Sequence, residues 1–357
     1  MDTTSAPQII EHLNKTITFT PFETKWIPST AKFILMGQTP RAKGIMQILE
    51  LNKTEMKLNY ETEVPEGIKC ATFGAAKVSG AEFAYGDFGG SLNIFDLEKQ
   101  KTYFSVTAHK GITNAIDGIG GADIGYGAPE IVTGGRDGCV RVWDQRQKSP
   151  VLALEPADKD SVVPDCWCVA FGNGYNSDER CLVAGYDNGD VKLFDLRKNC
   201  LVYDTNVKNG VCGVEFDRKD IIMNKLGVTT LEGKFHIYDL RTYHTEHEYA
   251  SLQQSGPKGT LWGLKHVPQN RDLFVVQGGD GSLNLYKYNY PSQRSIEAED
   301  RKPRGVIGSV ELLNSKEIAT QPIVSLDWNK DKLGLAVTAS LDQKCSVVIV
   351  SKLNNYQ

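Results

Sequence analysis

The chain has 357 residues, 40% hydrophobic and 24% charged, so it is long enough to bury a large core without disulfide or metal support. Its 40 Lys and Arg residues against 44 Asp and Glu residues give a formal net charge of -4, which argues against nucleic-acid binding through a basic surface. No apolar run approaches the roughly 18 residues of a membrane helix, and the N-terminal segment lacks the apolar core of a signal peptide. We therefore expect a cytoplasmic protein that contacts neither nucleic acid nor membrane.

In chain order, the first predicted strand is Lys15–Thr20, where polar and apolar residues alternate. Further along, a short segment of alternating residues recurs, beginning at Gly44, Gly90, Gly138, Gly189, Gly233, Gly281 and Lys344. The alternation is typical of strands, and the opening glycine predicts a preceding turn with positive φ. Two apolar strands precede each copy, and a further strand follows it.

Seven copies in 357 residues leave 51 residues per unit, close to the roughly 40–45 residues of a four-stranded propeller blade. The sequence therefore predicts an all-β fold: a single seven-bladed β-propeller over residues 1–357, with four antiparallel strands in each blade. The last repeat has no outer strand of its own, because only five residues follow Lys352. We expect the N-terminal strand Lys15–Thr20 to supply it and so close the ring, which removes a free sheet edge.

The third repeat contains the dipeptide Trp143-Asp144, and other repeats carry aromatic-Asp variants: Phe95-Asp96, Phe194-Asp195 and Tyr238-Asp239. The chain resembles the WD-repeat family over essentially its whole length. The resemblance implies that four residues of the third blade are the family's buried hydrogen-bond set: His109, Thr133, Asp137 and Trp143. A set of this kind satisfies several buried polar groups at once, so we predict a structural role rather than a catalytic one for His109 and Asp137.

Two further patterns resemble known kinds of site. Cys166 and Cys168 flank Trp167, and we expect their sulfur atoms to point to opposite faces of a strand, which disfavours a metal site. The glycine-rich stretch Gly118–Gly127 lacks the Gly-Lys-Ser/Thr ending of a phosphate loop, so we expect a long loop between two strands of the third blade. No cofactor and no metal site is predicted, and the protein is expected not to be an enzyme.

Candidate partner-binding residues fall into two groups. Trp167 and Trp262 are expected at equivalent positions of two inner strands, with Trp26 matching them in the first blade, where they could line the mouth of the central channel. The second group lies in a polar, nearly charge-balanced stretch, Ser292–Arg304, expected to be a mobile insertion. Its basic residues are Arg294, Arg301, Lys302 and Arg304. Long connections at 118–129, 172–180 and 291–304 are expected on one face of the disc.

A narrower resemblance is carried by stretches scattered along the chain, among them Asn209–Asp220, Ala115–Gly121, Gly127–Val132 and Pro268–Arg271. They are similar to a subgroup of WD-repeat proteins that act as cytoplasmic co-chaperone adaptors. This resemblance implies a monomeric, non-enzymatic scaffold that works with RuvB-like ATPases and prefoldin-like co-chaperone subunits in the assembly of axonemal dynein heavy chains, with an association with apoptosis.

Two alternatives remain open. A histone-tail or methyl-lysine reader would require a cage of exposed aromatic side chains at one channel mouth. A substrate receptor of a cullin-type ubiquitin ligase would require Arg146 and Arg197, from the Asp-x-Arg endings of two repeats, to be exposed on one rim.

Overall fold

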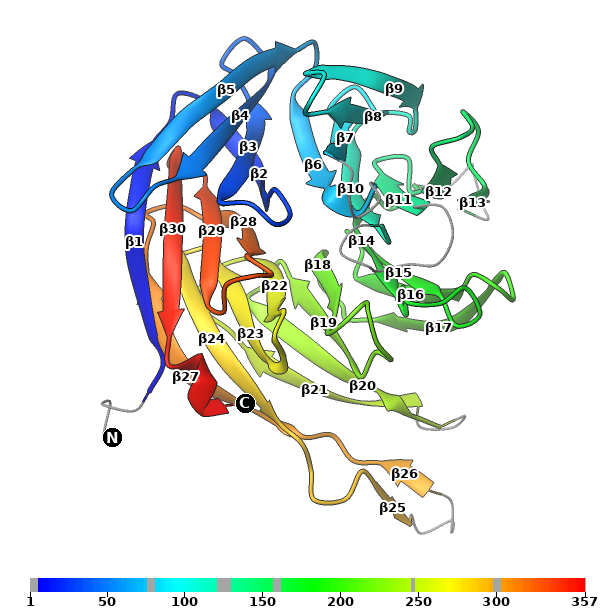
Figure 1. The fold of residues 1–357 in the computed structure, drawn as a ribbon. Coiled ribbons are helices and arrows are strands. Elements are labelled where there is room, and N and C mark those ends of the chain that lie inside the picture. Colours follow the sequence, from blue (N-terminus) through cyan, green and yellow to red (C-terminus); the bar gives the residue numbers. More distant parts are fainter. Residues whose placement is uncertain are drawn as a thin grey trace.

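A computed structural model describes residues 6–75, 81–120, 130–156, 162–244, 248–297 and 303–356. These residues form seven four-stranded antiparallel sheets arranged as blades around a central channel (Figure 1). The predicted seven-bladed β-propeller is therefore confirmed. Helical structure among the described residues is confined to two short 3-10 turns, Phe73–Ala75 (η1) and Leu353–Tyr356 (η2).

Each blade runs from an inner strand at the channel to an outer strand at the rim. Blade 1 comprises β2 (Thr20–Trp26), β3 (Lys32–Gln38), β4 (Gly44–Leu51) and β5 (Met56–Val64). Blade 2 comprises β6 (Ile68–Thr72), β7 (Glu82–Asp87), β8 (Ser91–Asp96) and β9 (Lys101–Thr107). Blade 3 comprises β10 (Thr113–Gly118), β11 (Glu130–Gly135), β12 (Val140–Asp144) and a short outer strand, β13 (Leu152–Leu154).

The second half of the ring repeats the same order. Blade 4 comprises β14 (Cys166–Gly172), β15 (Cys181–Tyr186), β16 (Asp190–Asp195) and β17 (Cys200–Asn206). Blade 5 comprises β18 (Val211–Phe216), β19 (Lys225–Thr230), β20 (Lys234–His244) and β21 (Glu248–Ser255). Blade 6 comprises β22 (Leu261–Val267), β23 (Asn270–Gly278), β24 (Ser282–Asn289) and β27 (Ser309–Glu317). Blade 7 comprises β28 (Ile323–Trp328), β29 (Leu335–Ser340), β30 (Lys344–Ser351) and β1 (Gln8–Thr16).

The hydrophobic core is divided into seven clusters, and each cluster lies between two neighbouring blades. Trp143 of blade 3, for example, packs with Leu92 and Ile94 of blade 2. Both faces of a blade are therefore covered by its neighbours, and a blade taken alone would expose two apolar faces to water. The ring has to close for this burial to be complete.

The N-terminal strand closes the ring, as expected, but its position differs from the sequence expectation. The closing strand β1 is Gln8–Thr16, paired from Gln8 opposite Ser351 to Thr16 opposite Lys344, rather than Lys15–Thr20. Ile17 and Phe19 are buried in the cluster between blades 7 and 1, and Thr20 already begins the inner strand of blade 1. Alternation continues from one strand into the next, so it could not locate the boundary.

Five of the repeat glycines have the positive φ that was expected of them: Gly90, Gly138, Gly189, Gly233 and Gly281. Gly138 and Gly281 have φ of 69° and 82°, and a Cβ at Gly281 would lie 1.9 Å from the Ala319 carbonyl oxygen. In the two weakest repeats another residue takes the left-handed conformation, Ala42 before β4 and Gln343 before β30. These blades still form complete sheets, because cross-strand pairing and inter-blade packing outweigh the local strain.

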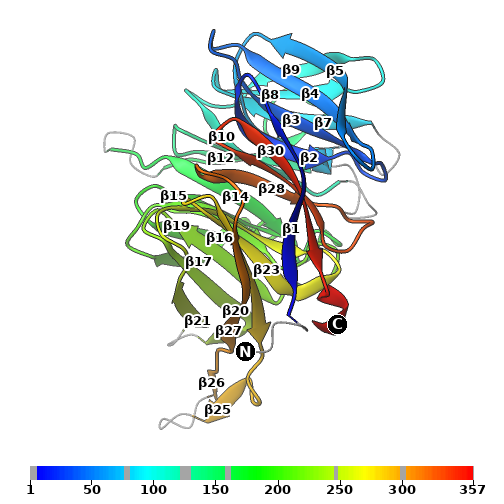
Figure 2. The same ribbon diagram turned by 90° about the vertical axis from the view of Figure 1, so that its left-hand side faces the viewer.

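The mobility expected of the insertion at 292–304 stays a prediction, but its described ends form regular structure. Ser295–Glu297 (β25) pairs with Pro303–Gly305 (β26) as a small hairpin, which extends from the disc beside the ends of β20 and β21 (Figure 2). A polar, charge-balanced composition predicts poor burial, but it does not forbid a two-stranded hairpin that packs on a neighbouring blade.

Candidate protein-interaction sites

The four residues assigned to the buried set in blade 3 form one chain of hydrogen bonds. The Trp143 indole N–H donates to the Thr133 hydroxyl at 2.9 Å, and Thr133 lies 2.8 Å from Nε2 of His109. The opposite ring nitrogen of His109, Nδ1, lies 2.8 Å from the Asp137 carboxylate. One assignment of protons satisfies every group: Thr133 donates to Nε2, and Nδ1–H donates to Asp137.

Arg141 joins this chain and was missed by the sequence reasoning. Its guanidinium donates to the Asp137 carboxylate at 3.0 Å and to the Ala108 carbonyl at 2.9 Å. Burial by itself would raise the pKa of Asp137, but hydrogen bonds from His109, the Lys110 N–H and Arg141 hold that pKa well below its ordinary value. The signal was present in the sequence, since Arg141 lies four residues after Asp137 on the strand that also carries Trp143.

All seven blades share a β-bulge near the start of the inner strand. In each blade one residue is passed over in the pairing between the inner strand and the next. Because these strands surround the channel (Figure 1), the passed-over residues form a ring around one end of it. We call them the bulge ring: Phe22, Lys69, Asn114, Trp167, Cys212, Trp262 and Val324.

Trp167 and Trp262 therefore occupy equivalent positions, as expected, but the expected match with Trp26 is wrong. The residue of blade 1 at that position is Phe22. Trp26 ends β2, is buried, and donates its indole N–H to the Asp327 carbonyl at 3.1 Å. It is the counterpart of Trp328, whose indole N–H likewise donates to the carbonyl of Lys265 in the preceding blade.

The bulge ring offers both aromatic surface and unsatisfied polarity. Lys69 Nζ lies 5.1 Å from the centre of the Phe22 ring, so one aromatic of the ring already holds a cation of this chain. The indole N–H of Trp262 is buried and makes no hydrogen bond among the described residues. No ring contact joins Phe22, Trp167 and Trp262 in the part of the chain that the structure describes.

The bulge at Trp167 also explains the two neighbouring cysteines. Cys166 packs between blades 3 and 4, whereas Cys168 packs between blades 4 and 5. The two sulfur atoms thus face opposite ways, as expected, although residues two apart on a regular strand share a face. The bulge between them is what separates them. No group of three or more His, Cys, Asp or Glu residues within the described ranges is placed to hold a metal ion.

Three residues after the bulge ring, the inner strands carry a ring of charges. Its members are Lys25, Asp117, Glu215, Lys265 and Asp327. Lys265 lies 2.6 Å from Glu215, and Lys219 from the connection after β18 pairs with Asp117 of blade 3, two blades away. The three carboxylates each accept a backbone N–H from the following blade: Asp117 from Phe171 at 2.8 Å, Glu215 from His266 at 2.7 Å, and Asp327 from Trp26 at 2.7 Å.

Buried carboxylates of this kind are costly unless they are paired. Burial would raise the pKa of Glu215, but the positive charge of Lys265 and the hydrogen bonds from His266 lower it to about 2. Around Asp327 the balance is different: burial dominates and raises its pKa, although Lys25 and the Trp26 N–H oppose the change. The charge ring therefore links neighbouring blades through its carboxylates. Glu215 is ionised near neutral pH, because its pKa is about 2.

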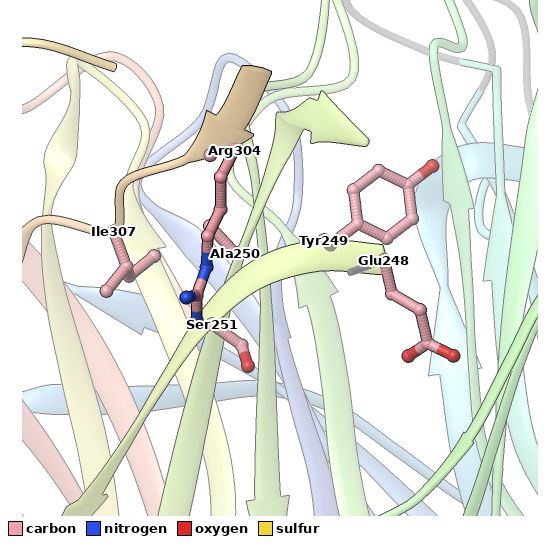
Figure 3. A pocket seen from close by; sticks show the side chains of 7 residues that line it. Glu248, Tyr249, Ala250, Ser251, Arg304 and Ile307 are labelled. Carbon is pink, nitrogen blue, oxygen red and sulfur yellow. The ribbon is translucent and has the colours of Figure 1, made fainter. Parts of the chain in front are cut away.

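The insertion places two of its four candidate basic residues in the described part of the chain. Arg294 stacks on Tyr290 at 4.7 Å, and Arg304 lines a cavity of about 220 Å³ between β26 and β21 (Figure 3). Arg301 and Lys302 lie outside the described residues. Trp167 and Trp262 lie on the inner strands β14 and β22, whereas Arg294 and Arg304 belong to the insertion, whose hairpin projects from the disc, so the structure does not bring the two groups of candidates together.

The Asp-x-Arg endings lie at the ends of the third strands of blades 3 and 4. The Arg146 side chain is 74% exposed and forms an ion pair with Asp144, and Arg197 is also exposed. No helix in the described ranges is long and apolar enough to cross a membrane.

Comparison with known proteins agrees with this architecture. Residues 100–144, which cover β9 to β12, match the family model for the WD domain, G-beta repeat. A Chlamydomonas reinhardtii protein called dynein axonemal assembly factor 10 is 53% identical over 357 residues, which is 99% of each chain. The Homo sapiens protein of that name is 53% identical over 350 residues, 98% of each chain, and the Dictyostelium discoideum one is 25% identical over 95% of this chain and 94% of its own.

These relatives agree with the narrower resemblance carried by stretches such as Asn209–Asp220, which is to the WD-repeat protein Monad. The identity spans every blade rather than a single repeat, and both the relatives and this chain are covered almost completely. The chain therefore belongs to the dynein axonemal assembly factor 10 family of WD-repeat β-propellers.

Proposed function

We propose that the protein is a monomeric, non-enzymatic scaffold that acts in the cytoplasm in the assembly of axonemal dynein. Identity of 53% over nearly the full length of relatives named for this process is the observation that carries the proposal. In this role it works with RuvB-like ATPases and prefoldin-like co-chaperone subunits, and its clients are dynein heavy chains. An association with apoptosis, implied by the same resemblance, stays a prediction.

A rigid ring suits a scaffold because its loops are held in fixed positions. Connections between the first and second strands of a blade, and between the third and fourth, emerge on the same face. That face therefore carries Gly172–Cys181 of blade 4, the described ends of the long connection in blade 3, and the insertion of blade 6. We place the main contact with co-chaperone or client on this face, ahead of the bulge ring at the channel.

The test is quantitative affinity purification of the tagged protein from the cytosol of a ciliated cell. RuvB-like ATPases, prefoldin-like subunits and dynein heavy chains are expected among the most enriched proteins. A purification that repeatedly recovers none of these would refute the proposed function.

Three variants distinguish the loop-rich face from the bulge ring. Replacing 291–304 by a short Gly-Ser linker should lower partner recovery, whereas Trp167→Ala and Trp262→Ala should leave it near the wild-type level. Undiminished recovery from the linker variant, together with loss in a folded Trp variant, would move the contact to the bulge ring.

One specific observation keeps a second function in view. Arg146 and Arg197 are both exposed at the same strand ends of adjacent blades, which is the arrangement that a cullin-type ubiquitin ligase receptor requires. Binding of the purified protein to the ligase adaptor, abolished by the double change Arg146→Ala and Arg197→Ala, would support this alternative. A methyl-lysine reader has no comparable support, since Phe22 already contacts Lys69.

A further inference from the structure

The hairpin β25–β26 belongs to blade 6 but packs on blade 5. Gly305 of β26 lies so close to β20 and β21 that a Cβ at this position would be 2.5 Å from Thr242 and 3.1 Å from Ala250. Only a glycine permits this approach. The contact fixes the hairpin over the outer part of blade 5, and Figures 1 and 2 both show it beside the ends of β20 and β21.

The hairpin and β21 together form a groove. β21 is the outermost strand of its sheet, so its outer edge pairs with no other strand among the described residues. The cavity of about 220 Å³ lies where this edge faces the hairpin and is lined by Glu248, Tyr249, Ala250, Ser251, Arg304, Gly305 and Ile307. An unpaired edge presents a row of backbone donors and acceptors to an added strand.

Positive charge in the groove is unmatched. Figure 3 shows the Arg304 side chain running from β26 toward Ser251, and it forms no ion pair or hydrogen bond within the described ranges. Glu248, the one acidic residue of the lining, lies at the other end of the cavity from Arg304 in Figure 3 and interacts with Tyr203. At the base of the hairpin, Nη1 of Arg294 is buried and has no acceptor among the described residues.

The groove also has apolar surface beside these charges. Ile296 lies opposite Arg304 in the hairpin and is 48% exposed. At the other end Tyr249 contacts Tyr243 with ring centres 5.0 Å apart, and Tyr243 is 52% exposed. A ligand that fits must therefore offer carboxylates to the arginines and an apolar side chain to Ile296 or Tyr243.

We infer that this groove binds an extended acidic segment of a partner protein, which adds as a strand to β21 and places carboxylates on Arg304 and near Arg294. Guanidinium groups bind carboxylates through paired, charge-assisted hydrogen bonds, and strand addition supplies the main-chain hydrogen bonds. The inference rests on the proposed scaffold function. It names the kind of partner segment that one surface of the loop-rich face would bind.

Fluorescence anisotropy with the purified full-length protein tests the groove directly. The probe is a labelled peptide in which glutamates flank a leucine, compared with the same peptide carrying glutamine in place of glutamate. We expect the acidic peptide to bind, and the neutral one to bind about tenfold more weakly or not at all. Arg304→Gln should weaken the acidic peptide by about tenfold, and Arg304→Glu should weaken it further.

Arg197→Gln is the matched control, because it removes an exposed guanidinium from a neighbouring blade and should leave the affinity unchanged. A peptide of the same charge interrupted by prolines should bind about tenfold more weakly, since proline cannot donate to the edge of β21. Equal binding of the acidic and neutral peptides, or of the wild-type and Arg304 variants, would overturn the inference. Binding of a phosphoserine peptide without binding of the glutamate peptide would overturn it as well.

The outcome is separable from that of the proposed function. If purified protein binds no acidic peptide while dynein-assembly partners are still recovered from cytosol, only the groove assignment fails. If the peptide binds but those partners are never recovered, the scaffold proposal fails and the groove remains.

Discussion

Replacing His109 by alanine tests whether the hydrogen-bonded set of blade 3 is a scaffold. His109 is 3% exposed and bonds Thr133 on one side and Asp137 on the other. The alanine removes both bonds and leaves a cavity the size of an imidazole ring. If the set is structural, the loss should appear as reduced stability of the contact between blades 2 and 3.

The size of the stability loss depends on which hydrogen bonds the neighbours of His109 retain. Asp137 still accepts hydrogen bonds from the Lys110 N–H and from Arg141, and Thr133 still accepts the indole N–H of Trp143. No buried group is left entirely without a partner, so the cost is that of a neutral bond and a charged bond, about 2–3 kcal/mol. The entropy of unfolding is about 2.1 cal/mol/K per residue. If the whole chain unfolds as one unit, this loss of stability should lower Tm by about 3–4 °C.

Thermal and urea unfolding, followed by circular dichroism, measure this change. His12→Ala is the matched control, since His12 is exposed and its loss should change stability by less than about 0.5 kcal/mol. Thr133→Val should cost at least as much as His109→Ala, because it removes the partner of two buried groups, the Trp143 N–H and His109 Nε2. A His109→Ala protein with wild-type Tm would refute the reasoning.

Three further predictions concern the ring. Deleting residues 1–16 removes β1 and exposes the edge of β30, so size-exclusion chromatography should show aggregation. Deleting residues 1–5 is the control and should cause no aggregation. A stable monomer without β1 would contradict the closure of the ring by this strand. For Glu215, a folded-state pKa of about 2 against an ordinary 4.5 means that its ionised form stabilises the fold above about pH 4.5 and that this contribution is lost as pH falls toward 2. Glu215→Gln should therefore lower stability at pH 7 and flatten its pH dependence in that window, and an unchanged acid slope in urea titrations would be against it. Gly281→Ala should lower the free energy of unfolding by about 3 kcal/mol or more, because strain at φ 82° adds to a clash with Ala319. Gly111→Ala is the control and should cost only about 1–2 kcal/mol, because φ is 90° there but the nearest neighbour atoms are 3.5 Å away. Equal losses in the two variants would show that the clash at Gly281 is relieved.

The sequence by itself determined the features that depend on local chemistry. Alternation in the repeated segment, which a glycine opens in six of its seven copies, defined the third strand of every blade, and counting the copies indicated seven blades. The resemblance to the WD-repeat family assigned His109, Thr133, Asp137 and Trp143 to one set, and the structure joins these residues by hydrogen bonds. Such signals are readable because side-chain period and turn conformation are set within a few residues.

Register and packing between distant segments were decided only by the tertiary structure. Alternation runs unbroken from β1 toward β2, so the closing strand was located by its pairing with β30, more than three hundred residues away. The bulge ring, which moved the blade 1 position from Trp26 to Phe22, depends on how each inner strand pairs with its neighbour. The insertion forms a hairpin that packs against β20 and β21 of blade 5, with a close approach at Gly305. A sequence records which residues prefer which local geometry, but the partner that each backbone meets is chosen by the closed ring as a whole.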